Sequence, residues 1–331
     1  MSVKIGLLGV GHLGKIHLNC IQQIPDLQLI GIYDLNQETS DRVAAEFSVK
    51  AFRDPDMLIS EVDALDIVTP TPTHHQWACR AIESGKHIFI EKPVTSTLSE
   101  AEELVELNKV PNLCIQVGHV ERFNPAMMAI AHIPLHPKFI EVHRLATFNP
   151  RGTDVSVILD LMIHDLDIIL SMVEGPIKNV YANGVNIVSD YPDIGNARIE
   201  WENGCVANVT ASRISLKNMR KMRLFQSNAY IGLDFLERKA QVIRMFEQRQ
   251  QLSDPDQGLE LETSKGTRYI DVTLPDVQPV NAIREELAHF ATCIKNGSRP
   301  EVGLQEAVAA LSLAVRIDNQ IRDNESQAVD A

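Results

Sequence analysis

The sequence predicts an α/β protein in which an N-terminal doubly wound parallel sheet is followed by an α+β domain with an open, mostly antiparallel sheet. Three observations support this prediction. Residues 1–121 alternate apolar, strand-like runs with amphipathic helical stretches. Residues 122–280 contain short strand candidates separated by turns such as Glu202-Asn203-Gly204. Two amphipathic helices follow over 281–323, and we expect them to pack back on the first domain, leaving a frayed tail at 324–331.

The composition is typical of a soluble globular protein. The chain has 331 residues, of which 44% are hydrophobic and 23% charged, and this length favours two domains. The net charge of −13 argues against nucleic acid or an anionic membrane as a partner. No apolar run could span a bilayer and the first strand begins at the N-terminus, so we expect a cytoplasmic protein without a signal peptide. The five widely spaced cysteines predict reduced thiols and no metal site.

The first strand ends in a glycine-rich turn. Val3–Leu8 is apolar and runs into Gly9-Val10-Gly11-His12-Leu13-Gly14, after which a helical pattern continues from Lys15 to Ile24. In such a motif the first glycine permits the turn, the second lets the backbone approach a pyrophosphate, and the third lets helix and strand pack closely. The helix N-terminus, with His12 and Leu13, then directs free N–H groups at the phosphates. The pattern predicts a Rossmann dinucleotide-binding domain.

The end of the second strand bears on the choice of cofactor. The strand Leu27–Tyr33 is followed by Asp34, twenty residues past Gly14. A carboxylate there accepts hydrogen bonds from ribose hydroxyls and repels a 2′-phosphate. Leu35-Asn36-Gln37 supplies no cation that would neutralise such a phosphate. NAD is therefore favoured over NADP.

The rest of the first domain repeats strand and helix. Further strands are expected at Lys50–Phe52, Ala64–Val68, His87–Ile90 and Leu113–Val117. Helices are expected at Asn36–Phe47 and from His74 to Ser84. A third helix is expected from a cap at Ser99 or Thr97 to Asn108. Ligands of doubly wound sheets bind at the carboxyl ends of the strands. The residues at two of these ends are therefore predicted to contact the cofactor: Thr69, Pro70, Thr71, His74, Glu91 and Lys92.

The second domain has a different pattern. Its expected strands are Phe139–Leu145, Val180–Val185, Ala197–Trp201, Cys205–Ala211, Arg220–Gln226, Ala229–Leu233 and Ala240–Arg244. A long helix is expected at about Val155–Met172, and the polar segment Gln248–Lys265 is expected to be a mobile loop. The closing helices are expected at Val280–Lys295 and Leu304–Arg322.

Three side chains are candidates for chemistry. Lys92 follows a buried strand and precedes Pro93, which can adopt the cis form, and its ammonium could stabilise a developing alkoxide. Asp160 and His164 lie four apart in the predicted helix and share a face, which is the arrangement of a general base supported by a carboxylate. The alternatives are a solvated lysine paired with Glu91 and a structural polar pair at a domain interface.

Further residues could hold an anionic substrate. His119, Arg122 and Asn124 follow the last strand of the first domain and either bind substrate or brace the hinge. Arg144, Arg151 and Arg213 could contact phosphate through their guanidinium forks, or form salt bridges. His17 is expected to be structural.

These motifs together resemble the Gfo/Idh/MocA oxidoreductases over nearly the whole chain. The resemblance is carried by the glycine turn, Thr69-Pro70 with His74, Glu91-Lys92-Pro93, and Asp160-x-x-x-His164-x-x-Asp167. It implies that a nicotinamide takes a hydride from a sugar or cyclitol carbon. Lys92 would orient the hydroxyl, His164 would take its proton and Asp160 would support the pair, with Asp160 and His164 contacting substrate. It also implies a homodimer or homotetramer that packs through the sheet of the second domain.

A shorter motif makes the resemblance to this family more specific. Gly118-His-Val-Glu-Arg-Phe-Asn-Pro125 is similar to the branch that contains UDP-N-acetylglucosamine 3-dehydrogenases. This predicts a nucleotide sugar as substrate. The alternatives are a free polyol, an inositol, an imine or a linear tetrapyrrole, or a nicotinamide-binding sensor without turnover.

Overall fold

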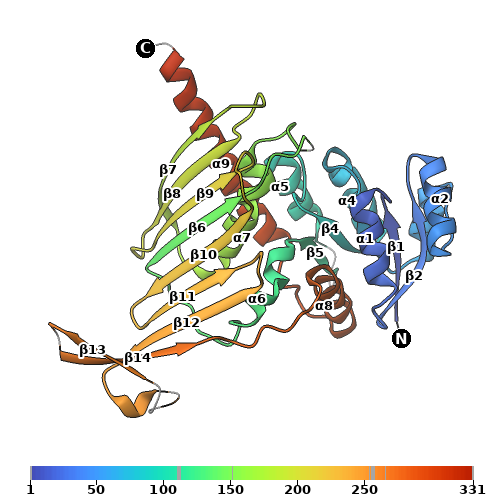
Figure 1. Cartoon of the computed structure of the whole chain (residues 1–331). Coiled ribbons are helices and arrows are strands. Elements are labelled where there is room, and N and C mark those ends of the chain that lie inside the picture. The colour runs from blue at the N-terminus through green and yellow to red at the C-terminus, as the bar shows by residue number, and fades with distance from the viewer. Residues whose placement is uncertain are drawn as a thin grey trace. The chain divides into compact units, whose positions relative to one another are not determined.

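The chain forms two compact units (Figure 1). The computed structural model describes residues 2–109, 113–150, 152–252, 254, 258–264 and 266–329, with side chains up to 324. The first unit comprises Met1–Phe123 with Val280–Ser312, and the second comprises Asn124–Pro279 with Leu313–Ala331.

The first unit is built on a five-stranded parallel sheet of order β2-β1-β3-β4-β5. Its strands are β1 (Val3–Leu8), β2 (Leu27–Tyr33), β3 (Ala64–Ile67), β4 (His87–Glu91) and β5 (Ile115–Gly118). Its helices are α1 (His12–Ile21), α2 (Gln37–Phe47), α3 (Pro55–Glu61), α4 (His74–Glu83), α5 (Leu98–Leu107) and α8 (Ala282–Asn296), with short 3₁₀ turns η1 (Thr71–Thr73) and η2 (Val120–Phe123). The predicted doubly wound parallel sheet is confirmed.

Local sequence explains most of these elements. Thr97 caps α5 in a capping box with Glu100, which settles the choice between the two expected caps. The expected strand at Lys50–Phe52 is wrong, because this segment makes only a single bridge between Ala51 and Ile32. Helix α3, which the sequence pattern did not predict, begins with an Asp54 cap followed by proline.

Apolar side chains packed against the sheet form the core of the first unit. Leu7, Leu18, Ile32 and Val43 form one cluster, which joins the sheet to α1 and α2. A second cluster joins β1, β4 and α1 to the returning helix α8, where the rings of Phe89 and Phe290 lie 5.9 Å apart. Helix α8 thus packs on the sheet of the first unit.

The second unit is built on a nine-stranded sheet of order β13-β14-β12-β11-β10-β6-β9-β8-β7. Its strands are β6 (Phe139–Leu145), β7 (Ile177–Val185), β8 (Ile194–Trp201), β9 (Val206–Ser212), β10 (Met219–Gln226), β11 (Ala229–Asp234), β12 (Lys239–Phe246), β13 (Leu259–Thr263) and β14 (Gly266–Thr273). Every pairing is antiparallel except that of β6 with β9. The predicted mostly antiparallel sheet is confirmed.

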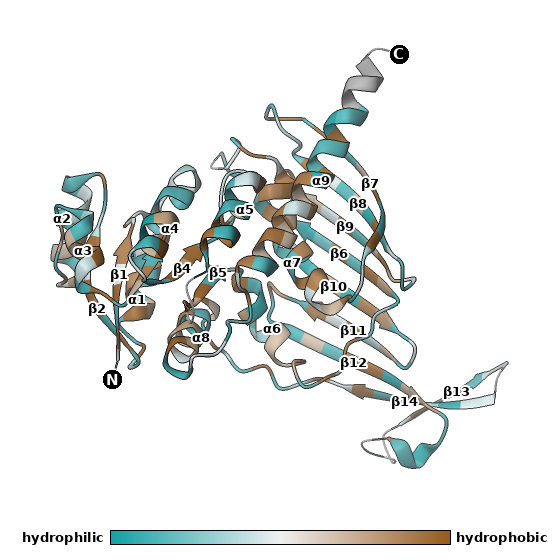
Figure 2. Ribbon diagram, turned by 180° about the vertical axis from the view of Figure 1, so that it is seen from behind, coloured by the Kyte–Doolittle hydropathy of each residue, from teal (hydrophilic) through white to brown (hydrophobic). Residues whose placement is uncertain are grey.

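Helices cover one face of this sheet. The helical elements are α6 (Pro125–Met128), the π-helical turn η3 (Ile158–Met162), α7 (Ile163–Met172), the 3₁₀ turn η4 (Arg249–Gln251) and α9 (Leu304–Val329). Figure 2 shows α6, α7 and the later part of α9 on the same face. Within the described residues no helix covers the opposite face, which Figure 1 presents to the viewer.

Three features of the second unit differ from expectation. The segment Gln248–Lys265 is not a loop throughout, since it contains η4 and strand β13, which pairs with β14 at the sheet edge. Its polar composition misled the prediction because both faces of an edge hairpin can be exposed. Helix α9 was expected on the first domain with a frayed tail after 323, but it is divided between the two units and continues to Val329.

Within the described residues no helix is both long and apolar enough to cross a membrane. The same part of the chain holds no cluster of three metal-binding side chains.

Candidate functional site

The glycine turn at the end of β1 has the geometry that its sequence predicts. Gly9 adopts a φ of +89°, and a β-carbon there would lie 2.7 Å from the Val68 carbonyl oxygen. Both facts require glycine. A β-carbon on Gly14 would lie 2.1 Å from the carbonyl oxygen of Gly9, so the third glycine is what brings α1 so close to the turn.

The start of α1 can receive an anion. A β-carbon added to Gly11 would meet no atom within 4 Å, so the backbone is open on that side. Gly11 is the N-cap and makes no side-chain cap, and His12 is the exposed first residue of the helix, followed by half-buried Leu13. The first N–H groups of this helix are therefore presented together with the positive end of its dipole.

Asp34 lies beside the same turn. One of its carboxylate oxygens accepts the N–H of Val10 at 2.9 Å, and the other accepts the N–H of Asn36 at 2.9 Å. The side chain is half-buried, so the carboxylate still has room to accept further hydrogen bonds. The open backbone at Gly11, the uncapped helix and this carboxylate fit the pyrophosphate and ribose of a dinucleotide.

The residues after β3 form a braced loop. Thr69 accepts a hydrogen bond from the Thr73 hydroxyl at 2.7 Å, and Pro70 and Thr71 lead into η1. His74 is 1% exposed, with its ring nitrogens 2.8 Å from the Thr69 carbonyl and 2.9 Å from the Pro93 carbonyl. Burial lowers the pKa of His74, whereas the two backbone carbonyls favour its protonated form. This corrects the expectation for His74, whose side chain ties the ends of β3 and β4 together instead of contacting a cofactor.

The Glu91-Lys92-Pro93 turn follows β4. The Lys92–Pro93 peptide bond is cis, as the sequence allowed. Glu91 is 9% exposed, and one of its carboxylate oxygens accepts the backbone N–H of Lys92 at 3.1 Å. The Lys92 side chain is half-buried. The turn therefore begins with a buried carboxylate that accepts the backbone N–H of the following residue.

A buried ionisable cluster behind this turn escaped the sequence analysis. The fully buried ring of His17 contacts the Asp66 carboxylate at 2.9 Å and the Glu91 carboxylate at 3.2 Å. Glu286 of α8 is also fully buried. The available signal was a charged residue inside the apolar strand Ala64–Ile67, since buried charges are nearly always paired.

The pKa values of the cluster shift upward. Burial by itself would lower the pKa of His17, but Asp66 and Glu91 outweigh it and raise the pKa well above its ordinary value. Burial raises the pKa of Asp66. Burial, aided by the negative charges of Glu91 and Asp66, raises the pKa of Glu286 well above its ordinary value.

The candidates at the end of the first domain are buried. His119 is 1% exposed, and Arg122 is 9% exposed with its guanidinium 3.8 Å from Glu301. Asn124 caps α6 by accepting the N–H of Ala126 and donates to the Phe235 carbonyl at 3.1 Å. These positions favour bracing over substrate contact, and for Asn124 the structural role replaces the predicted one. Arg151 lies outside the described residues.

The second unit carries the acid–base candidates on its first long helix. Asp160 lies in the π-helical turn η3 and His164 in the first turn of α7, and both are half-buried. Single π-helical turns occur frequently at functional sites. A β-carbon on Gly152 would lie 3.3 Å from an Asp160 carboxylate oxygen, so the preceding loop closes over this carboxylate.

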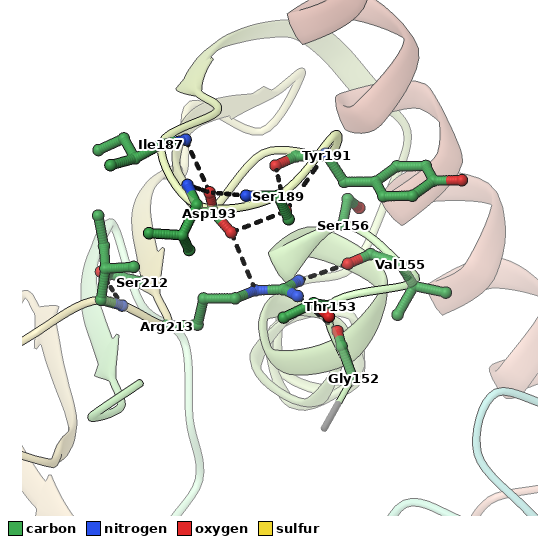
Figure 3. A network of polar contacts seen from close by, with 12 residues as sticks. Gly152, Thr153, Val155, Ser156, Ile187, Ser189, Tyr191, Asp193, Ser212 and Arg213 are labelled. Carbon is green, nitrogen blue, oxygen red and sulfur yellow. Dashed lines mark hydrogen bonds and ion pairs between the residues drawn. The ribbon is translucent and has the colours of Figure 1, made fainter. Parts of the chain in front are cut away.

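Two arginines proposed for phosphate binding are structural. Arg144, 3% exposed, makes a two-pronged salt bridge with Asp165 of α7 at 2.6 and 2.8 Å. Arg213, 5% exposed, donates to the carbonyl oxygens of Gly152 and Val155 (Figure 3). Their guanidinium forks are occupied by the protein itself, which corrects the expectation for both.

Figure 3 shows what Arg213 anchors. Its Nε lies 3.8 Å from Asp193, which is fully buried and accepts the backbone N–H groups of Ile187, Val188 and Ser189. Burial opposes ionisation, but these hydrogen bonds outweigh it and lower the pKa of Asp193. The Asp193 carboxylate thereby fastens the loop between β7 and β8, and the Arg213 guanidinium fastens the loop that leads into η3.

Both domains match known protein families. The model of the oxidoreductase family GFO/IDH/MocA, NAD-binding Rossmann fold, matches residues 3–119. The model of the GFO/IDH/MocA C-terminal domain matches residues 140–231.

Named relatives are dehydrogenases. The UDP-N-acetylglucosamine 3-dehydrogenase of Acidithiobacillus ferrooxidans is 40% identical over 71% of this chain and 75% of the relative. A crystal structure of UDP-N-acetylglucosamine 3-dehydrogenase GnnA from that organism superposes with a TM-score of 0.86 at 32% identity, covering 97% of this chain and 98% of the other. The scyllo-inositol 2-dehydrogenase (NAD(+)) of Bacillus subtilis is 28% identical over 97% of this chain and 95% of the relative. This chain belongs to the GFO/IDH/MocA family of NAD-binding oxidoreductases and is a dehydrogenase that acts on alcohol groups.

Proposed function

We propose that this dehydrogenase oxidises a secondary alcohol of a UDP-linked N-acetylated sugar, as a UDP-N-acetylglucosamine 3-dehydrogenase. The observation that carries the choice of substrate is the 40% identity to the Acidithiobacillus ferrooxidans enzyme. The second candidate is an inositol, because the scyllo-inositol dehydrogenase aligns with 97% of the chain.

The proposed roles follow from the chemistry of the side chains. Oxidation removes a hydride from the carbon and a proton from the hydroxyl, and a bound nicotinamide supplies the hydride acceptor. The Lys92 ammonium donates a hydrogen bond to the hydroxyl oxygen and stabilises the negative charge that develops on it. The His164 imidazole takes the hydroxyl proton, and the Asp160 carboxylate favours the protonated ring.

We propose NAD as the cofactor. Gly9, Gly11, His12, Leu13 and Gly14 would hold the pyrophosphate, and Asp34 would bind the ribose hydroxyls. Thr69, Pro70, Thr71, Glu91 and Lys92 would border the nicotinamide at the ends of β3 and β4. The carboxylate of Asp34 supports NAD over NADP because it repels a 2′-phosphate.

The test is the absorbance of reduced nicotinamide after mixing protein, NAD and UDP-N-acetylglucosamine with a carbonyl trap. We expect turnover in the wild type and a loss of about 10³-fold in kcat in Lys92→Ala and in His164→Ala. Both variants should still bind NAD. Lys109→Ala, which removes an exposed lysine of the same unit, should keep wild-type turnover.

The outcomes separate the parts of the proposal. Turnover retained in both Lys92→Ala and His164→Ala would contradict the catalytic roles. Turnover of inositols with none of UDP-N-acetylglucosamine would replace the proposed substrate by the second candidate. NAD binding without turnover of any sugar or polyol would favour a sensor.

We also propose a cytoplasmic homodimer or homotetramer that packs through the uncovered face of the sheet in the second unit. Large apolar side chains are exposed on that sheet, including Tyr181, Phe225 and Met245. Apolar side chains exposed on an uncovered sheet face support association. All five cysteines are free, which fits a reducing compartment.

A further inference from the structure

The histidine three residues after the glycine motif belongs to no part of the proposed chemistry, yet it is fully buried among acids. His17 comes from α1, Asp66 from β3, Glu91 from β4 and Glu286 from α8. Their exposed fractions are 0%, 0%, 9% and 0%. Four elements of the first unit thus bring one imidazole and three carboxyl groups into the interior, where uncompensated charge is costly.

His17 lies between two carboxyl groups. Its Nδ1 is hydrogen-bonded to Asp66 at 2.9 Å, and its Nε2 lies 3.2 Å from Glu91, a charge contact that is not a hydrogen bond. Burial by itself would lower the pKa of His17, but the two carboxyl groups outweigh it and raise the pKa, which favours the protonated ring.

Glu286 is the third carboxyl group of the cluster. Within the described residues neither of its carboxyl oxygens has a hydrogen-bond partner. Burial raises the pKa of Glu286 well above its ordinary value, which favours its neutral form. His17, Asp66 and Glu286 in turn act on the neighbouring Cys20 of α1, whose pKa is raised chiefly by burial.

The Glu91 carboxylate is confined from three sides. His17 holds one oxygen at 3.2 Å, and the other accepts the N–H of Lys92 at 3.1 Å. On the third side lies Gly118 of β5, where a β-carbon would come within 2.8 Å of the carboxylate. A glycine at this position is what leaves room for the buried acid.

We propose that His17 is a positioning residue for Lys92: bridging Asp66 and Glu91, it fixes the carboxylate that binds the Lys92 backbone N–H and so sets the place of the Lys92 ammonium. This inference rests on the proposed role of Lys92. A displacement of a reacting group by about 1 Å can lower a rate about 100-fold, so an indirect effect of this kind is measurable.

A double-mutant cycle in the full-length enzyme tests the route through Glu91. We expect His17→Gln to lower kcat about 10- to 100-fold, with the Kd for NAD and the KM for the alcohol within threefold of wild type. In a Glu91→Ala background the same substitution should change kcat less than twofold, because the carboxylate that links His17 to Lys92 is already absent. His75→Gln, which replaces a half-buried histidine also paired with a carboxylate, is the matched control and should leave kcat unchanged.

A second measurement needs no substrate. In protein labelled with ¹⁵N-lysine, the Lys92 amide signal is assigned by its absence in Lys92→Arg. This signal should shift in His17→Gln but stay in place in His75→Gln. Gly118→Ala provides an independent variant, since it displaces the Glu91 carboxylate with His17 intact, and it should shift the same signal.

The two experiments together test whether His17 positions Lys92. An unshifted Lys92 amide in His17→Gln and Gly118→Ala, or effects of His17→Gln and Glu91→Ala on kcat that multiply, would overturn the proposal and leave His17 a structural residue. Failure of the wild type to oxidise UDP-N-acetylglucosamine would instead contradict the proposed substrate, while the amide measurement stays readable.

Discussion

At the scale of single residues, each of the three glycines in the first turn has its own steric role. Gly9 needs its positive φ, Gly14 allows the approach of α1, and Gly11 leaves the backbone open. Asp34 then lies against this turn through the N–H of Val10. Each residue would contribute one element of the proposed dinucleotide site, and the spacing in the sequence is enough to anticipate this geometry because all the contacts are local to one βαβ unit.

Asp34 yields a prediction about cofactor choice. Asp34→Asn combined with Leu35→Arg removes the negative charge and adds a cation at a position that is 74% exposed. We expect the ratio of kcat/KM for NADP to that for NAD to rise by about 10- to 100-fold, which corresponds to about 1.4–2.8 kcal/mol. Steady-state kinetics with both cofactors measure this ratio. Leu35→Gln with Asp34 intact is the control, and an unchanged ratio in the double variant would show that Asp34 does not select the cofactor.

At the scale of elements, the loop before η3 is held by a buried ion pair. Arg213, at the end of β9, binds two carbonyl oxygens of this loop, and Asp193 binds three backbone N–H groups of the loop between β7 and β8 (Figure 3). The same loop passes over Asp160. The position of the proposed acid–base helix therefore depends on residues that belong to neighbouring strands.

This anchor predicts a large loss of stability. Arg213→Ala leaves the Asp193 carboxylate buried without its cation and removes two hydrogen bonds, so the free energy of unfolding should fall by about 3–5 kcal/mol. Arg198→Ala removes an arginine that is paired with Glu200 on the exposed part of β8, and it should cost less than about 1 kcal/mol. Denaturant unfolding followed by circular dichroism compares the two. Equal losses would rule out the anchoring role of Arg213.

At the scale of the whole molecule, the sheet of the second unit has two different faces. Along β10, Met222 and Leu224 are buried beneath the helices, whereas Arg223 and Phe225 lie on the other side. The Phe225 ring lies 5.8 Å from Phe139 and 5.1 Å from Tyr230. An aromatic group at the centre of an uncovered sheet is typical of an interface between subunits.

The expected assembly can be tested at Phe225. Phe225→Asp places a charge in the proposed interface, and we expect the mass measured by light scattering to fall from that of a dimer or tetramer to that of a smaller species. Leu216→Asp changes an apolar residue that is 98% exposed outside the strands and should keep the wild-type mass. A wild-type protein that is monomeric at micromolar concentration would refute the interface.

The sequence by itself determined those features of this protein that depend on residues close together in the chain. The strand and helix pattern of the first domain, the glycine turn and the place of Asp34 all follow from periodicity, backbone sterics and strand ends, whereas the sequence only allowed the cis Lys92–Pro93 bond. The same holds for most strands of the second domain, because alternation along a half-buried strand is a local signal.

Only the tertiary structure decided which charges are buried together. His17, Asp66, Glu91 and Glu286 are up to 269 residues apart in the chain (17 to 286), and Arg213 meets Gly152 only because β9 pairs with β6. A sequence shows that such residues are charged, but not which partners will share their low-dielectric surroundings. For this reason arginines expected to bind phosphate proved to be structural, and a histidine expected to be structural became the candidate that positions Lys92.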